Sequence, residues 1–398
     1  MKYSLEQFAN CIKKSSEHFA NLELSKVFSS EGDSFERAAL EFSGEFELPS
    51  NLTPLHTTSH LRGIEITLDV FPKPSENSWD IHLSVGYPKN ESELRPSRVM
   101  IKRLVTRRLL AYFSENVLPN PFISTSERLG IALFYRDLDS NRNALVEQLQ
   151  GLASSSRKNK RIDPFDLIQK ATSRFALPVH ENIDFVRGLS DVQKGNSSIE
   201  SINLGGYIEK MMGGAYRVED EQIMFSNNKR GVKRVRIPLH LGSSSLRSLT
   251  DIFFYLRYVA EVGDLLMVDE PESHLTPQNQ VILARMLAAT VNAGVRVFIT
   301  THSDYLIREI NNLIMLGGIP ESGREKLFKE LGYESSEILK AGDVAAYVCK
   351  NGRTEPCDFS PYGIEIKNID EAIEDLNERT NLLAGLVAIE QEAKSLVG

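Results

Sequence analysis

Two short apolar segments that end in polar residues constrain this sequence most. Residues 265–268 (Leu-Leu-Met-Val) are followed by Asp269 and Glu270, and residues 297–299 (Val-Phe-Ile) are followed by two threonines and His302. Residues 278–292, which lie between the two segments, have the length and the pattern of a helix. Fully apolar strands joined by a helix are typical of a parallel sheet covered on both faces, so the sequence predicts an α/β fold.

The polar residues after these strands are candidates for chemistry, because ligands of parallel α/β sheets bind beyond the carboxyl ends of the strands. Asp269 can hold Mg²⁺ through water, and Glu270 can orient or deprotonate an attacking water. A right-handed crossover places His302 near both acids, where it can contact a phosphate. Each residue taken alone also has a simpler interpretation, as a solvated acid at a strand end or as a structural histidine.

A third element precedes the acidic strand. Ser243, Ser244 and Ser245 open the helix expected over 248–262, where hydroxyls and free backbone N–H groups form a natural phosphate site. The alternative is that these serines only cap the helix.

Together, these elements resemble the C-terminal lobe of ABC-type ATPases of the SMC, RecF and OLD group, and more narrowly the bacterial AAA family ATPases of that group. In this resemblance Ser243–Ser245 match the signature segment, Asp269 and Glu270 the Walker B pair, residues 273–276 the D-loop, and His302 the switch histidine. Ser245 stands where the signature usually has glycine. Residues 122–128 resemble the strand and Glu-Arg turn before the family's helical insertion, with a structural ion pair as the alternative role of Arg128.

The resemblance implies a P-loop NTPase fold of the ABC ATPase type, with a parallel sheet, an antiparallel β region and a helical insertion. It implies ATP and Mg²⁺ as cofactors, hydrolysis coupled to dimerisation, and a homo-oligomer that controls a partner. A separate effector protein and a nucleic acid are both open as partners, and many relatives serve DNA repair or phage defence.

The sequence has no Gly-x-x-x-x-Gly-Lys-Ser/Thr, the loop that cradles the phosphates in such enzymes. The expected reason is a missing N-terminal segment, a split gene, a misplaced start codon or degeneration. Whether the chain is an enzyme therefore stays open, and the alternative is a non-hydrolysing interaction subunit that needs a P-loop in trans. A nuclease domain like that of OLD proteins is not expected, because the roughly 80 residues after the histidine's helix are too few for one.

Four regions are expected along the chain. The antiparallel β region is predicted from alternating segments at 64–70 and 80–85, and helices are predicted at 1–22 and 96–113. The expected regions are the remainder of an N-terminal ATPase lobe without its P-loop (1–135), a mainly helical insertion with short strands (136–235), the C-terminal ATPase lobe (236–350) and a helical tail (351–398).

Composition excludes several other classes of protein. The net charge of −8 argues against a general polyanion binder, and three scattered cysteines suit neither a disulfide framework nor a zinc site. No stretch approaches the roughly 20 apolar residues that span a bilayer, and the N-terminus lacks the apolar core of a signal peptide, which predicts a cytoplasmic location without a membrane partner. The basic runs at 102–108, 157–161 and 229–236 are interpreted as solvated surface.

Overall fold

The computed structural model describes residues 2–4, 54–61, 64–73, 78–86, 108, 112, 119–134, 175–199, 202–219, 222–227, 235–350 and 353–397. The chain divides into two compact units. The first consists of Met1–Thr125, Phe134–Arg187 and Gly263–Leu265, and the second of Ser126–Leu133, Gly188–Val262 and Leu266–Gly398. Most of the helix predicted at 96–113 and residues 136–174 of the predicted insertion lie outside the described residues.

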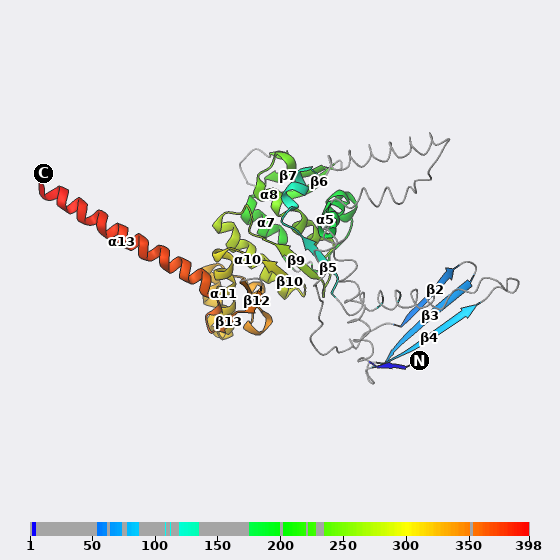
Figure 1. The fold of residues 1–398 in the computed structure, drawn as a ribbon. Helices are drawn as coiled ribbons and strands as arrows, with labels where there is room; N and C mark the ends of the chain where they lie inside the picture. Colours follow the sequence, from blue (N-terminus) through cyan, green and yellow to red (C-terminus); the bar gives the residue numbers. More distant parts are fainter. Residues whose placement is uncertain are drawn as a thin grey trace, which may run out of the picture. The chain divides into compact units, whose positions relative to one another are not determined.

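The first unit contains a four-stranded antiparallel sheet in the order β1-β4-β3-β2 (Figure 1). Its strands are β1 (Lys2–Ser4), β2 (Leu55–Leu61), β3 (Ile64–Lys73) and β4 (Ser78–Gly86). Ile66, Leu68 and Val70 of β3 are buried at every second position, as the alternating pattern predicted. The predicted helix at 1–22 is wrong for its first residues, because Lys2–Ser4 pair with β4 in the sheet, and the rest of that segment lies outside the described residues.

β5 (Pro121–Ser124) and α5 (Leu177–Arg187) also belong to the first unit. The predicted strand at 122–124 is confirmed. Asn182 of α5 is buried and fixes the end of β5, since its Nδ2 donates to the Ile123 carbonyl and its Oδ1 accepts the Thr125 N–H at 2.9 Å. Phe122 packs edge-on against Phe185, with ring centroids 4.8 Å apart.

The second unit begins with α6 (Leu189–Val192) and α7 (Leu204–Met212), followed by the antiparallel sheet β6-β7-β8. The strands are β6 (Gly214–Glu219), β7 (Gln222–Asn227) and β8 (Arg236–Pro238), and the sequence predicts short strands there at 215–218, 222–225 and 236–239. A short 3₁₀ turn, η3 (Leu239–Leu241), then leads to two helices, α8 (Ser244–Ser248) and α9 (Thr250–Tyr258). The single helix predicted over 248–262 is therefore wrong in its bounds.

The predicted strand-helix-strand unit is present as β9 (Leu265–Asp269), α10 (Pro277–Asn292) and β10 (Arg296–Thr300). β9 and β10 are neighbours in one sheet, and the Glu270 N–H donates to the Thr300 carbonyl at 3.2 Å. Because the carboxyl ends of the two strands meet, the strands run parallel, as expected. The expectation that both strands are covered on both faces is wrong for β10, where Phe298 is 52% exposed.

α11 (Asp304–Gly318) packs against α10, and Leu313, Ile314 and Leu316 of α11 form a core cluster with Ala288 and Leu339. The helix α12 (Glu321–Leu331) and the 3₁₀ turn η4 (Ser335–Glu337) follow. After residue 316 the apolar pattern of the sequence weakens and predicts a loop, and that prediction is wrong at α12. The helix has no buried residue, so its sequence carries little apolar periodicity.

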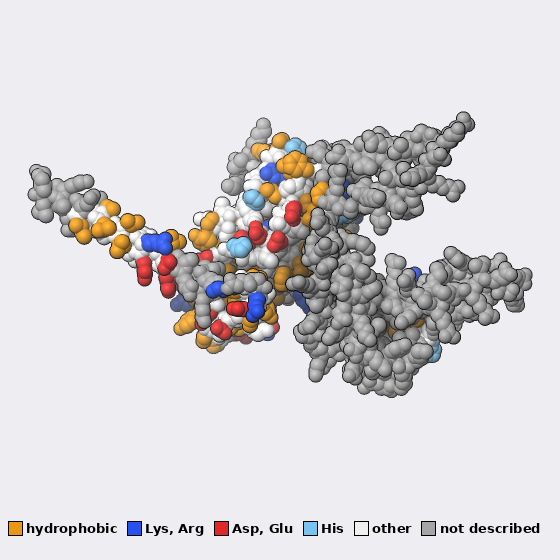
Figure 2. Space-filling view, viewed as in Figure 1, with side chains coloured by type: hydrophobic (Ala, Val, Ile, Leu, Met, Phe, Trp, Pro, Cys, Tyr) orange, Lys and Arg blue, Asp and Glu red, His pale blue; other side chains and the backbone are white. Residues whose placement is uncertain are grey.

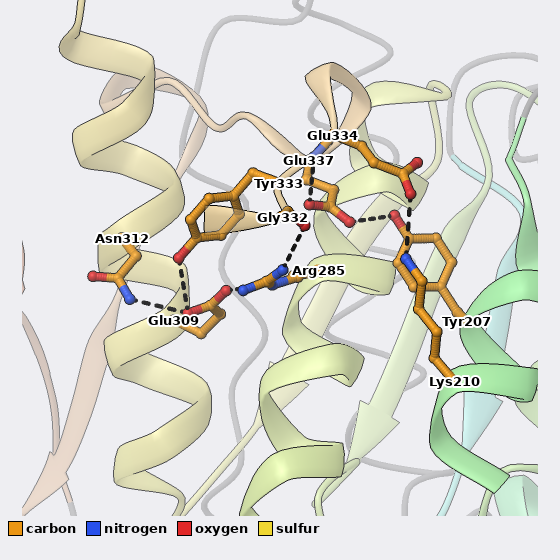
Figure 3. A network of polar contacts seen from close by, with 9 residues as sticks. All are labelled: Tyr207, Lys210, Arg285, Glu309, Asn312, Gly332, Tyr333, Glu334 and Glu337. Carbon is orange, nitrogen blue, oxygen red and sulfur yellow. Dashed lines mark hydrogen bonds and ion pairs between the residues drawn. The ribbon is translucent and has the colours of Figure 1, made fainter. Parts of the chain in front are cut away.

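A polar network holds the segment after α12 against α10 and α11 (Figure 3). Arg285 of α10 donates to the buried carboxylate of Glu309 at 2.6 Å and to the Gly332 carbonyl at 3.0 Å, and it stacks over the Tyr333 ring at 4.1 Å. Asn312 and Tyr333 donate to the other oxygen of Glu309. A buried charge is stable only when it is paired and hydrogen-bonded, and Glu309 meets both conditions.

A second part of the network in Figure 3 ties the same segment to α7. Tyr207 donates to Glu337 at 2.8 Å, and Glu337 is almost fully buried. Burial, with the Glu337 carboxylate as a lesser cause, raises the pKa of Tyr207. The phenol therefore keeps the proton that it donates.

Two hairpins and a long helix complete the chain. The hairpins are β11–β12 (Tyr347–Lys350 and Arg353–Pro356) and β13–β14 (Asp358–Ser360 and Gly363–Glu365), joined by a short 3₁₀ turn, η5 (Ala341–Asp343), to the rest of the unit. The helical tail expected over 351–398 is helical in α13 (Lys367–Val397), but the expectation is wrong for residues 353–365, which form strands of the two hairpins. Within the described residues, no helix is long and apolar enough to cross a membrane.

Candidate nucleotide site

The carboxyl ends of β9 and β10 bring Asp269 and Thr300 together. The Thr300 hydroxyl donates to Asp269 Oδ1 and accepts the Glu270 N–H at 3.1 Å. The Asp269 side chain is exposed, and the hydrogen bond from Thr300 occupies its Oδ1. A single exposed carboxylate suits Mg²⁺, which keeps several waters and takes further ligands from phosphates.

Glu270 has an unusual backbone conformation. Its φ is 46°, in the left-handed region that costs a residue with a side chain about 1–2 kcal/mol. Strain of this kind persists only where the surroundings impose it, and it concentrates at functional sites. The two Thr300 contacts to its N–H hold one side of the residue, and Arg128 holds the other.

Arg128 is a buried cation whose guanidinium donates to main-chain carbonyls of the described residues. Its Nε donates to the Ser248 carbonyl at 2.9 Å, its Nη1 to the Asp269 carbonyl at 2.6 Å, and its Nη2 to the Glu270 carbonyl at 2.5 Å. The guanidinium thus fastens the end of α8 to the end of β9. Its planar fork is suited to this task, because it presents five donors in a rigid arrangement.

The Glu270 carboxylate points toward the next loop and toward His302. Ser273 donates to Glu270 Oε2 at 2.9 Å, and His302 Nε2 lies 4.0 Å from Glu270 Oε1. The histidine side chain is 88% exposed and that of Glu270 42% exposed, so both groups are accessible to a ligand. The expected proximity of His302 to Glu270 is therefore present.

Glu272 fixes the loop that carries the histidine. Its Oε1 accepts the Thr301 hydroxyl at 2.7 Å and the His302 N–H at 2.8 Å. Ser303, the N-cap of α11, donates to Gln280 of α10 and accepts the N–H of Leu306. The backbone of His302 is consequently held from both neighbouring segments, while its ring is left exposed.

The predicted serine segment lies beside the loop after β9. Ser243 caps α8 by accepting the Leu246 N–H at 3.3 Å, and Ser245 donates to the His274 carbonyl at 2.6 Å. His274, at φ 66°, is the other described non-glycine residue in the left-handed region. The capping role foreseen as an alternative is thus present for Ser243, and the contact of Ser245 connects α8 to the loop that also contacts Glu270.

The donor set does not suggest a metal site made by protein ligands alone. Among the described residues, no three His, Cys, Asp or Glu side chains form a group that could hold a metal ion.

Comparison with known proteins gives the class of this region. Residues 136–307, which include β9, α10, β10 and His302, match the model of the family described as AAA ATPase domain. Residues 136–307 are thus similar to an AAA ATPase domain, a match that covers less than half of the chain. Domains of this family bind nucleotides, so the predicted resemblance is confirmed at that level. The search of curated proteins found no match.

Two solved structures are similar to parts of the chain. One comes from work titled "Structural biochemistry of ATP-driven dimerization and DNA stimulated activation of SMC ATPases", with 14% identity, 50% of this chain and 96% of that chain covered, and a TM-score of 0.26. The other is an Smc head domain with an extended coiled coil bound to the C-terminal domain of ScpA from Pyrococcus furiosus, with 13% identity, 62% and 67% covered, and a TM-score of 0.22.

Sequence motifs singled out the acids, the histidine and the serines of this region, but they gave no role to Thr300 or Glu272. Thr300 contacts both Asp269 and Glu270, and Glu272 contacts the His302 loop. The available signal was position, because Thr300 ends β10 as Asp269 ends β9. Arg128 had a sequence signal in its resemblance to a family turn, but its three carbonyl contacts could not be foreseen.

Proposed function

We propose that the AAA ATPase domain of this chain supplies the hydrolytic half of an ABC-type ATP site. Asp269 holds Mg²⁺ through water, Glu270 is the general base, and His302 contacts the γ-phosphate. The observation that carries the proposal is the conformation of Glu270, which is strained, fastened by Arg128 and Thr300, and directed toward an exposed histidine.

The chain's own residues account for the chemistry in separate roles. MgATP supplies the bond to be cleaved and the metal that neutralises charge on the phosphates. The Glu270 carboxylate accepts a proton from water, and the Ser273 hydroxyl keeps one of its oxygens in place. Thr300 donates to Asp269 Oδ1, which leaves the other oxygen for magnesium-bound water.

Ser243, Ser244 and Ser245 act on a nucleotide bound by another subunit in this proposal. Support comes from the contact between Ser245 and the loop that follows Glu270, which connects the two segments within one chain. A homo-oligomer in which ATP closes the subunits on one another, and control of an effector protein in DNA repair or phage defence, belong to the same proposal. Nucleic-acid binding and a cytoplasmic location stay predictions.

A second function is favoured by one feature of the sequence. The 398 residues contain no Gly-x-x-x-x-Gly-Lys-Ser/Thr. A non-hydrolysing interaction subunit would keep the fold and the subunit surface and would take phosphate contacts from a separate chain.

The test measures ATP turnover by the assembly that is purified, through a tag on the full-length chain, from the cells that naturally produce it. Glu270→Gln should lower turnover about 10²–10⁴-fold, because it removes the base and keeps the side chain's shape. Glu321→Gln, on the exposed first turn of α12, is the matched control and should leave turnover unchanged. Equal turnover of the Glu270→Gln and wild-type assemblies would refute the role of Glu270, and an inactive wild-type assembly would favour the interaction subunit.

A further inference from the structure

The hydroxyl of Ser245 is committed to a contact within its own chain. It donates to the His274 carbonyl oxygen, and the two oxygens lie 2.6 Å apart. A serine hydroxyl has one hydrogen to donate, and an ionised phosphate oxygen accepts hydrogen bonds without donating any. The Ser245 hydroxyl can therefore bind a phosphate only by giving up its contact with His274.

Ser243 differs from Ser245 in what its hydroxyl does. It accepts the Leu246 N–H at 3.3 Å, which leaves its own hydrogen for a further acceptor. A contact with a nucleotide therefore suits Ser243 better than Ser245. Ser245 also stands where the related signature usually has glycine, so the resemblance gives its side chain no task.

The carbonyl that Ser245 contacts belongs to a segment with an unusual backbone, residues 270–274. Glu270 and His274 stand at its two ends with φ of 46° and 66°, in the left-handed region that disfavours residues with a side chain. Such a conformation persists only where the surroundings impose it. Inside the segment, Ser273 donates its hydroxyl to Glu270 Oε2 at 2.9 Å and its N–H to the Glu270 carbonyl at 3.0 Å. The residue before His274 thus orients the Glu270 carboxylate.

The same segment lies partly at the surface. Figure 2 shows acidic and histidine side chains at the surface between the places that Figure 1 labels α8 and β9, and the side chains of Asp269 and His274 are exposed. Water competes for hydrogen bonds there, so the segment depends on a few specific contacts. The Ser245 hydroxyl supplies one of them from α8.

Arg128 connects α8 to the same segment a second time. Its guanidinium donates to the Ser248 carbonyl at the end of α8 and to the Glu270 carbonyl. The hydroxyl of Ser248 in turn donates to the Ser245 carbonyl at 3.0 Å, within this one short helix. The beginning of α8 is thus tied to His274, and its end to the backbone of Glu270.

We propose that Ser245 is a positioning residue, which holds residues 270–274 so that Ser273 keeps the Glu270 carboxylate in the orientation that accepts a proton from water. The inference rests on the proposed function, in which Glu270 is the general base. Ser243 and Ser244 contact the nucleotide of another subunit, whereas Ser245 acts on catalysis only through its own chain. Contact with that nucleotide and orientation of the base then depend on the same short helix.

Hydrogen exchange followed by mass spectrometry tests the contact on the purified full-length chain without nucleotide. Ser245→Ala should speed the exchange of a peptide that contains the Ser273 and Leu275 N–H groups about 2–12-fold, the factor expected from the loss of one hydrogen bond. Ser245→Thr keeps a hydroxyl and should exchange like the wild type. Ser335→Ala, at an exposed serine of η4, is the control and should change nothing in this peptide. Unchanged exchange in Ser245→Ala would overturn the proposal.

Steady-state ATP turnover by the purified native assembly tests the role in catalysis. Ser245→Ala should lower kcat about 2–12-fold and leave the KM for MgATP within about twofold, because the hydroxyl does not contact the nucleotide. Ser245→Thr should restore kcat. In a chain that already carries Glu270→Gln, Ser245→Ala should cause no further loss, because it acts through the carboxylate that is missing there.

The kinetic outcomes separate this proposal from the proposed function. A raised KM with an unchanged kcat would make Ser245 a nucleotide contact and overturn its positioning role. A loss that multiplies with that of Glu270→Gln would overturn it as well. If Glu270→Gln alone leaves turnover unchanged, the proposed function itself fails, and the role of Ser245 in catalysis fails with it.

Discussion

The strained backbone of Glu270 predicts that glycine stabilises the protein more than alanine at this position, which reverses the usual order. At ordinary positions, replacing Ala by Gly destabilises a protein by about 0.5–1 kcal/mol, because glycine loses more backbone freedom on folding. At φ 46° the left-handed region costs an alanine about 1–2 kcal/mol that glycine does not incur. Glu270→Gly should therefore be more stable than Glu270→Ala by up to about 1 kcal/mol.

The comparison uses two variants that both lack the carboxylate, so lost contacts to Ser273 and His302 cancel. Urea unfolding of the full-length chain measures the difference in midpoint and slope. Lys340 is the control, because it is exposed and has a φ of −98°. There the Gly variant should be less stable than the Ala variant. If Gly is the less stable choice at both positions, Glu270 is not strained and the observation behind the proposed function fails.

Two further predictions concern stability. Arg128→Lys should lower the free energy of unfolding by about 1–3 kcal/mol, because a lysine ammonium cannot reach all three carbonyls and leaves a buried carbonyl oxygen unpaired. A thermal midpoint equal to that of the wild type would show that the guanidinium contacts do not stabilise the fold. Gly317→Ala should lower the free energy of unfolding by about 1–3 kcal/mol, because the added Cβ would lie 2.0 Å from the Leu339 carbonyl oxygen. Gly318→Ala should raise it by up to about 1 kcal/mol, because a Cβ there meets nothing within 4 Å. Equal effects of the two alanines in thermal unfolding would contradict this close packing.

The parallel core was predictable because its signals are local. β9 and β10 are short apolar runs, α10 begins with a Thr cap and Pro277, and the crossover rule places the strands side by side. The grouping of Asp269, Glu270 and His302 follows from that topology alone. The alternation of apolar and polar residues also predicted β3 and β4, because one face of β3 is buried.

Other features depend on tertiary contacts that the sequence does not display. The break at Leu249 is hidden because residues 249–256 are all buried and give no change of pattern. The strand at Lys2–Ser4 forms by pairing with β4, which overrides its local helical pattern. Arg128 and Thr300 act through main-chain atoms, and a motif defined by side-chain types cannot register such contacts.

The Arg285–Glu309 network also could not be predicted from the sequence. Its members come from α10, α11 and the segment that follows α12, and nothing in their spacing connects them. The buried Glu309 is intelligible only once Arg285, Asn312 and Tyr333 are seen around it. Charged residues at such positions look like ordinary surface residues in the sequence.

The most direct test of the central claim, that Asp269, Glu270 and His302 serve a nucleotide without a P-loop in the same 398 residues, is a titration of the purified chain with MgATP. The main phosphate contacts in such enzymes come from P-loop amides and lysine, and carboxylates repel a triphosphate unless magnesium intervenes. We expect a dissociation constant in the millimolar range, about −4 kcal/mol, observed as ³¹P line broadening. Asp269→Asn should abolish the broadening and Glu321→Gln should leave it unchanged. Low-micromolar affinity, or millimolar binding that persists in Asp269→Asn, would contradict the account.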